Sequence, residues 1–354
     1  MDFLTSANPR VVFAFWLGVV VIAMALLMLV VIIVMRQLVM RRERNRIRAA
    51  THWHQILVDS AQGLNTSPPS LPRNDLPGFV DAWNHVHQTL GNHDDTGLQR
   101  VAREIGLERH LYLAIDHGNF HNRVMSIIAL GYLKSRTHFD KLARYLDDRS
   151  TIISLSAARA LMHIDPARAV TMLVPHIVQR GDWPQGGVAQ ILHDASPALV
   201  SKELSEVTLR ANADVAPRLI RFLADVSPTA AAPVIRSILA SPPDDHLVST
   251  CLQVMTDPAD LDLIRSLLTH ERWHVRMHAA AALGRMGEAS DEKRLLPLLK
   301  DSQWWVRYRA AQAISRLPGM DEEGMQRVRA KQIDRFACDV VDQVMAERNM
   351  GVDQ

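Results

Sequence analysis

The sequence is poor in the residues that build sheets, turns and disulfide frameworks. Aromatic residues make up 5% of its 354 positions, with 16 glycines and 17 prolines, which is thin for an all-β protein with its many turns. The two cysteines, Cys251 and Cys338, are too few for a disulfide framework or a cysteine zinc cluster and suit a reducing compartment. The motifs GxxxxGK[ST] and GxSxG are absent, as is GxGxxG after a strand, so the common nucleotide-binding and hydrolase signatures are missing.

Positive charge is scarce outside one stretch of the chain. The net charge is +2, but six arginines and Glu43 between residues 36 and 48 give that stretch a local charge of +5, which leaves −3 for the rest. Because phosphate contacts need a positive surface, we expect no nucleic-acid partner. These six arginines, the basic collar, are Arg36, Arg41, Arg42, Arg44, Arg46 and Arg48.

A long apolar run precedes the basic collar. Residues 11–35 hold no charge and no proline, and at 1.5 Å per residue they exceed the ~30 Å hydrocarbon core of a bilayer. A signal peptide would have a shorter apolar region and a small-x-small cleavage site, whereas this run ends in Met35 and Arg36. We therefore predict one uncleaved transmembrane helix. Positive charge stays inside, so residues 1–10 are expected outside a bacterial inner membrane and the rest in the cytoplasm.

The segments after the apolar run divide by composition. Residues 36–64 are predicted to form a basic juxtamembrane helix, whose arginines fix topology and weakly attract anionic lipid head groups. Residues 65–78 (NTSPPSLPRNDLPG) are rich in proline and predict a semi-rigid linker that separates the membrane segment from the folded body.

The remainder of the chain is an internal repeat. Residues 273–287 match residues 304–318 at an offset of 31, which places Arg276 on Arg307 and two alanine pairs on each other. Each period also contains a second apolar stretch, so the unit is helix, turn, helix, repeated at least seven times, as in an α-solenoid. The central apolar position of each period falls on Leu130, Leu161, Leu192, Leu223, Leu252, Leu283 and Ile314.

The pattern V-R-x-x-A-A-x-A-L-G-x-M-G at residues 275–287 resembles the HEAT repeat in its short bacterial form, which phycobilin lyases share. The resemblance implies an all-α HEAT-type solenoid over residues 79–320, and we expect residues 321–354 to form a C-terminal capping helix. The layout with one membrane span also resembles bacterial single-pass HEAT proteins of envelope polysaccharide or glycosyltransferase systems. The apolar stripe predicted for the capping helix consists of Val328, Ile333, Phe336, Val340, Val341 and Val344.

Histidines and arginines are the candidates for chemistry. His274 and His278 lie four apart and could share one helical face as a zinc pair, but the sequence offers no third ligand nearby, so we expect no metal, no cofactor and no enzyme activity. Arg276 and its equivalents resemble the ladder arginine of HEAT-like repeats, which implies bonds to acidic groups such as Asp301 and Glu271. The alternative is that these arginines anchor a ligand. The alternative that remains is a HEAT-scaffold enzyme or lyase whose ligands are dispersed over several repeats.

Four of the seven tryptophans lie just before first helices of repeats. The repeat register predicts that they line one edge of the stack. Such rings act as hydrophobic staples on the first turn, as a partner-binding edge, or as contacts with the lipid interface. We expect a membrane-tethered cytoplasmic scaffold that binds protein partners in a membrane-associated complex. The candidate edge consists of Trp183, Trp273, Trp304 and Trp305.

Overall fold

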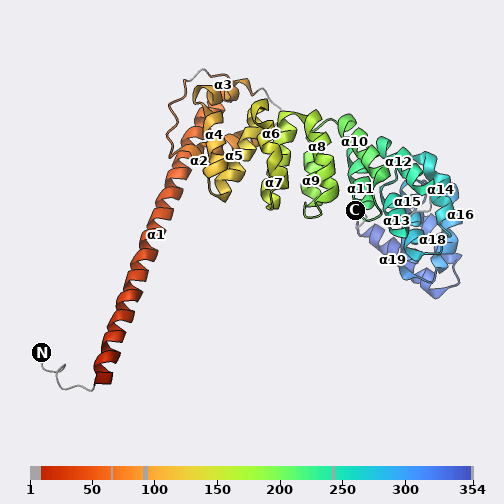
Figure 1. Cartoon of the computed structure of the whole chain (residues 1–354). Helices are drawn as coiled ribbons and strands as arrows, with labels where there is room; N and C mark the ends of the chain where they lie inside the picture. Colours follow the sequence, from red (N-terminus) through yellow and green to blue (C-terminus); the bar gives the residue numbers. More distant parts are fainter. Residues whose placement is uncertain (1–8, 65–66, 91–94, 241–243, 352–354) are drawn as a thin grey trace. The chain divides into compact units, whose positions relative to one another are not determined.

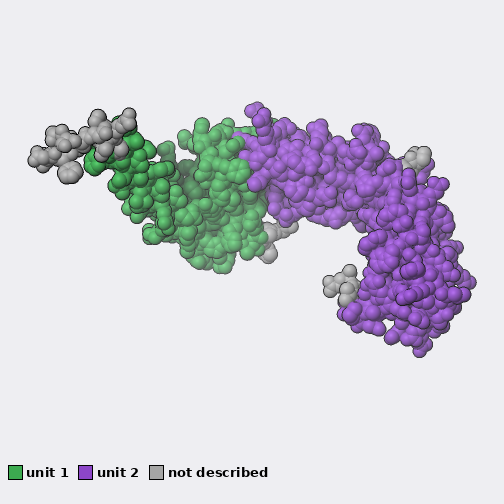
Figure 2. All heavy atoms as spheres, turned by 90° about the horizontal axis from the view of Figure 1, so that it is seen from below, with its two compact units in different colours: residues 1–142 green, residues 143–354 purple. Residues whose placement is uncertain are grey.

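The structure is a computed structural model that describes residues 9–64, 67–90, 95–240 and 244–351. The described residues form helices and contain no strand, which confirms the all-α prediction. The chain divides into two compact units, residues 1–142 and 143–354 (Figure 2). Unit 1 contains α1 (Pro9–Ala61), α2 (Leu76–Leu90), α3 (Thr96–Glu104), α4 (Leu107–His117), α5 (Phe120–Leu133) and most of α6 (Phe139–Ala143).

Helix α1 is one continuous helix of 53 residues (Figure 1). Its described apolar side chains from Phe13 to Met40 are exposed, and it is the one described helix that is long and apolar enough to cross a membrane. A signal sequence near the N-terminus also passes this test of length and apolar composition.

The C-terminal part of α1 packs on α2, which corrects the predicted linker. Trp53 is buried and meets the ring of Phe79 edge-on, at 5.0 Å between centroids. Residues 76–78 already belong to α2, so the proline-rich stretch connects two packed helices and does not separate the membrane segment from a folded body. The proline at position 77 suits the first turn of α2, because its missing N–H would have no helical partner there.

A glycine and an ion pair hold α1 against α2. A Cβ on Gly78 would lie 2.7 Å from the Cβ of Ala49 and closer still to the carbonyl of Arg46, so only glycine permits this approach. Nε of Arg46 donates to Asp81 at 2.5 Å, which ties one arginine of the predicted basic collar to α2. The 14 helical rises from Met35 to Ala49 span about 21 Å of continuous helix.

Unit 2 is built from helix pairs whose first helices contain the repeated apolar position. That position is fully or almost fully buried in every repeat, including Leu130 in unit 1, so the period of 31 identified the core correctly. The helices of unit 2 are α7 (Thr151–Ile164), α8 (Pro166–Gln179), α9 (Gln185–His193), α10 (Pro197–Arg210), α11 (Ala216–Val226), α12 (Pro228–Ala240), α13 (Asp245–Val254), α14 (Leu261–Leu267), α15 (Trp273–Met286), α16 (Glu292–Leu295), α17 (Trp304–Arg316), α18 (Glu322–Ala330) and α19 (Arg335–Asn349).

Small residues let α15 and α17 approach closely. A Cβ on Gly284 would lie 2.6 Å from the Cα of Ala313. Ala280 and Ala311 are fully buried, as the repeat pattern predicts. Leu283 and Ile314 fill the space beside these alanines and are fully buried too, because neither helix can cover its apolar face alone.

The C-terminal segment forms two helices where one capping helix is predicted. Asp334 accepts a hydrogen bond from the backbone N–H of Phe336 at 3.3 Å and starts α19 as its N-cap. Val328 of α18 and the three valines of α19 are buried, but Ile333 is 95% exposed and Phe336 is 61% exposed. The predicted continuous stripe is therefore wrong at these two positions, because the turn before Asp334 interrupts the helical register.

Candidate partner-binding edge

Exposed aromatic rings gather where the first helices of the C-terminal repeats begin. Trp273 is 39% exposed, Trp304 is 40% and Trp305 is 52% exposed. Phe336 stands 31 residues after Trp305, at the equivalent place in α19. We call these four residues, Trp273, Trp304, Trp305 and Phe336, the aromatic edge. Sequence reasoning missed Phe336, although the offset of 31 from Trp305 could have found it.

The start of α17 is fixed by an arginine–aspartate pair. Arg276 of α15 donates to both carboxylate oxygens of Asp301, at 2.7 and 2.9 Å, and Asp301 accepts from the N–H of Gln303 at 2.9 Å. Arg276 also donates to the backbone carbonyls of His270 and Glu271, at 2.8 and 2.9 Å. The ladder interpretation is confirmed for Arg276 and Asp301, whereas Glu271 contributes its carbonyl instead of its carboxylate.

This pair makes the turn before α17 sensitive to acid. Burial alone would raise the pKa of Asp301, but the hydrogen bonds from Arg276 and from the N–H of Gln303 hold that pKa below its ordinary value. A carboxyl whose pKa is lowered by folding stabilises the fold fully above its unfolded pKa of about 3.9. This contribution to the free energy of unfolding is lost as the pH falls through the lowered folded pKa.

The tryptophans of α17 are partly packed on their own helix. Trp304 stacks on Tyr308 one turn later, at 5.2 Å between centroids and 8° between planes. Trp305 meets Trp304 edge-on at 4.8 Å. The hydroxyl of Tyr308 donates to Glu347 of α19 at 2.8 Å, which ties this cluster to the next helix. Trp304 therefore has a staple-like contact on one face, while about half of Trp305 stays in contact with solvent.

Trp183 does not belong to the aromatic edge, and its predicted exposure is wrong. It is 4% exposed, and its Nε1 donates to Ser154 of α7 at 2.9 Å. Its ring stacks near His176, at 6.4 Å between centroids, and the guanidinium of Arg180 lies 5.7 Å from the ring centroid. The turn before α9 thus folds this ring inward, where it links α7 to α8.

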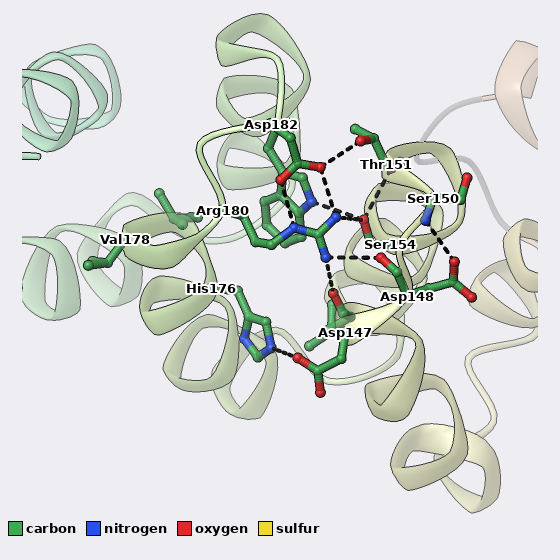
Figure 3. A network of polar contacts seen from close by, with 12 residues as sticks. Asp147, Asp148, Ser150, Thr151, Ser154, His176, Val178, Arg180 and Asp182 are labelled. Atoms are coloured by element: carbon green, nitrogen blue, oxygen red, sulfur yellow. Dashed lines mark hydrogen bonds and ion pairs between the residues drawn. The ribbon is translucent and has the colours of Figure 1, made fainter.

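The polar network around Arg180 explains this inward position (Figure 3). Arg180 donates to both oxygens of Asp182, at 2.7 and 2.8 Å, and to the carbonyls of Leu146 and Asp148, at 3.0 Å each. Asp182 also accepts from the hydroxyl of Thr151 at 2.6 Å. The hydrogen bonds from Arg180 and Thr151 lower the pKa of Asp182 below its ordinary range. The side chains of this network pair with one another and with nearby carbonyls, and they hold the turn between α8 and α9 in place.

The histidines of α15 have separate surroundings. The ring of His274 meets Trp273 edge-on at 5.8 Å, and Nε2 of His278 lies 3.1 Å from Nε2 of Gln253 on α13. Burial, followed by the positive charge of Arg309, lowers the pKa of His278 to about 4. Within the described ranges, no group of three histidine, cysteine, aspartate or glutamate side chains is placed to hold a metal ion.

The aromatic edge lies where the first helices of successive repeats begin. Comparison with known families shows which kind of repeat part of this region matches. Residues 246–315 match the family model of HEAT repeats. This HEAT segment runs from α13 to α17 and includes three of the four rings of the aromatic edge, while Phe336 follows it. The HEAT segment is thus a helical repeat of a kind that commonly mediates protein–protein interaction.

Solved structures similar to the chain are distant. An engineered protein is 14% identical, with a TM-score of 0.34, over 87% of this chain and 95% of the other. The complex of CpcE and CpcF of phycocyanin lyase from Nostoc sp. PCC7120 is 15% identical, with a TM-score of 0.27, over 79% of this chain and 97% of the other. No curated protein matches the sequence.

Proposed function

We propose that this protein is a membrane-tethered scaffold that binds a protein partner through the aromatic edge. The observation that carries the proposal is the row of half-exposed rings at equivalent positions of successive HEAT-type repeats. Large aromatic side chains are enriched among the residues that dominate binding energy at interfaces. Trp273 and Trp304 recur at the repeat period and keep about 40% of their surface exposed, which leaves area for a partner besides the staple-like contact of Trp304.

The anchor in this proposal is the N-terminal half of α1. Its apolar run supports a membrane span, and the exposed arginines of the collar support a cytoplasmic position for the repeats. Because α1 continues without a break into its packing contact with α2, the span would hold α2 at a set distance from the bilayer. The collar arginines other than Arg46 remain exposed for weak contacts with anionic lipid head groups.

The proposed role is non-catalytic, and the partner is a protein of a membrane-associated complex. The setting in an envelope polysaccharide or glycosyltransferase system rests on the resemblance of the layout to single-pass bacterial HEAT proteins. Binding at a solenoid edge needs no cofactor, and its specificity comes from side chains that several repeats place in a row.

A reporter fusion tests the orientation. A reporter that is active only in the periplasm, fused after Gln354, is expected to stay silent, because the collar holds its flank of the span in the cytoplasm. A matched fusion of the same reporter at the N-terminus is expected to be active. The opposite pattern would show that the repeats face the periplasm and that the proposed orientation is wrong.

Site-specific cross-linking tests the binding edge. A photoactivatable phenylalanine in place of Trp305 is expected to cross-link the full chain to a protein in intact cells, because this ring is half-exposed on the edge. The control position is Lys293, which is exposed on α16 and lies outside the edge. Equal cross-linking at both positions, or none at position 305, would contradict binding through the aromatic edge.

A further inference from the structure

Two arginines at equivalent positions have different partners. Arg276 and Arg307 stand 31 residues apart, each on the first helix of its repeat. Arg276 holds the carboxylate of Asp301 with two hydrogen bonds. Within the part of the chain that the structure describes, Arg307 makes no hydrogen bond or ion pair with a carboxylate, and its buried Nε has no acceptor.

The difference follows from one residue in the next turn. Asp301 stands three residues before the start of α17, and the residue three before the start of α19 is Gln332. The period of 31 gives the same equivalence. Gln332 uses its side-chain amide to donate to the carbonyl of Val328 at 3.2 Å. At the place where Asp301 offers a carboxylate to Arg276, Gln332 therefore offers Arg307 only a neutral amide.

The surroundings of Arg307 combine exposed apolar groups with positive charge. Its guanidinium lies over the ring of Phe336, 5.2 Å from the ring centroid, and Phe336 and Ile333 are the most exposed apolar residues of this end of the chain apart from Met350. Arg335 is 90% exposed, with its nearest carboxylate, Asp339, at 3.9 Å. The exposed side chains of Ile333 and Phe336 lie beside the guanidinium of Arg307, which has no carboxylate partner among the described residues. This surface is complementary to a segment that carries both a carboxylate and an apolar side chain.

We propose that Arg307, Ile333 and Phe336 form a docking surface for an acidic segment of a protein partner, in which an aspartate or glutamate pairs with Arg307 while an adjacent apolar side chain packs on Ile333 and on the ring of Phe336. In this arrangement the partner supplies to Arg307 the carboxylate that Asp301 supplies to Arg276. The inference rests on the proposed function, because it specifies the chemistry of the partner that the aromatic edge binds.

The test uses the full chain in its membrane, with a photoactivatable phenylalanine at position 305 as the probe. Arg307→Gln is expected to lower the yield of the protein cross-link about tenfold or more, since hydrogen bonds to charged groups are the strong ones. Arg307→Lys keeps the charge but loses the forked geometry, so an intermediate yield is expected. The cross-linked partner peptide is expected to contain an aspartate or glutamate close to the attachment point.

A substitution that introduces a carboxylate beside Arg307 provides the matched control. Gln332→Asp restores the residue type of Asp301 and is expected to raise the melting temperature while it lowers the cross-link yield, because Arg307 would then have an internal partner. Gln332→Asn, which adds no charge, is expected to change neither. These variants keep the test decisive even where Arg307→Gln lowers the melting temperature.

The outcomes separate this inference from the proposed function. A wild-type cross-link yield in both Arg307→Gln and Gln332→Asp would overturn the acidic partner while the aromatic edge stands. A cross-link from position 305 to lipid instead of protein would overturn the docking surface. If the chain with the probe at position 305 and no other substitution gives no cross-link, the proposed function itself is contradicted.

Discussion

Replacing Ala311 with glutamate is expected to unfold the C-terminal repeats while the N-terminal repeats of unit 2 stay folded. Ala311 is fully buried in α17, which packs on α15. Overpacking alone costs about 1–3 kcal/mol in the free energy of unfolding, and an unpaired buried carboxylate adds a desolvation cost of several more. Because each repeat contacts mainly its neighbours, the damage should stay local.

Hydrogen exchange measures this localisation. Residues 261–345 are expected to lose amide protection in the Ala311→Glu variant, and residues 151–179 of α7 and α8 are expected to keep most of theirs. Gln326→Glu adds the same charge at an exposed position of α18, and it should leave both regions protected. A uniform loss of protection along unit 2 would mean that the unit unfolds as one cooperative domain.

The repeat core could be predicted from the sequence because its physics is periodic. A residue such as Leu283 must fill the same space in each repeat, so burial repeats with the period of 31. The resemblance to HEAT repeats implied the contact of Arg276 with Asp301, and the structure confirms it. The burial of the core depends on spacing along the chain, which the sequence displays directly.

Contacts that occur in only one place along the chain could not be predicted from the repeat period. The proline-rich stretch was predicted to be a spacer, but Trp53 packs on α2, so the stretch is a connecting loop. Composition could not separate the two, because loops and spacers share it. Trp183 turns inward because Ser154 offers an acceptor for its Nε1. Each case depends on a partner distant in sequence that the repeat period does not specify.

The N-cap at Asp334 shows a third limit. Periodicity alone joined Val328, Ile333 and Phe336 into one apolar stripe, although the aspartate before Phe336 is a typical helix start. The structure ends α18 at Ala330 and starts α19 at Arg335, and this break exposes Ile333 and Phe336. The predicted cap was thus wrong at two residues of the proposed docking surface, Ile333 and Phe336.

Replacing Trp273 and Trp304 together with glutamine is expected to abolish most partner binding with a small effect on stability. Both rings are about 40% exposed, so their removal leaves no buried cavity, and loss of the stacking between Trp304 and Tyr308 costs about 0.5–1.5 kcal/mol. Truncation of an interface hot spot typically costs about 2 kcal/mol or more in binding free energy. The matched control is Leu199→Gln, because Leu199 of α10 is also 40% exposed and lies off the edge.

The most direct test is the amount of protein partner that co-purifies with the full-length double variant from detergent-solubilised membranes, compared with the wild-type chain and with Leu199→Gln at matched melting temperatures. Binding through the aromatic edge predicts that the double variant retains less than about a tenth of the wild-type amount while Leu199→Gln retains it all. A wild-type amount of partner on a normally melting double variant would contradict the aromatic edge as the binding surface.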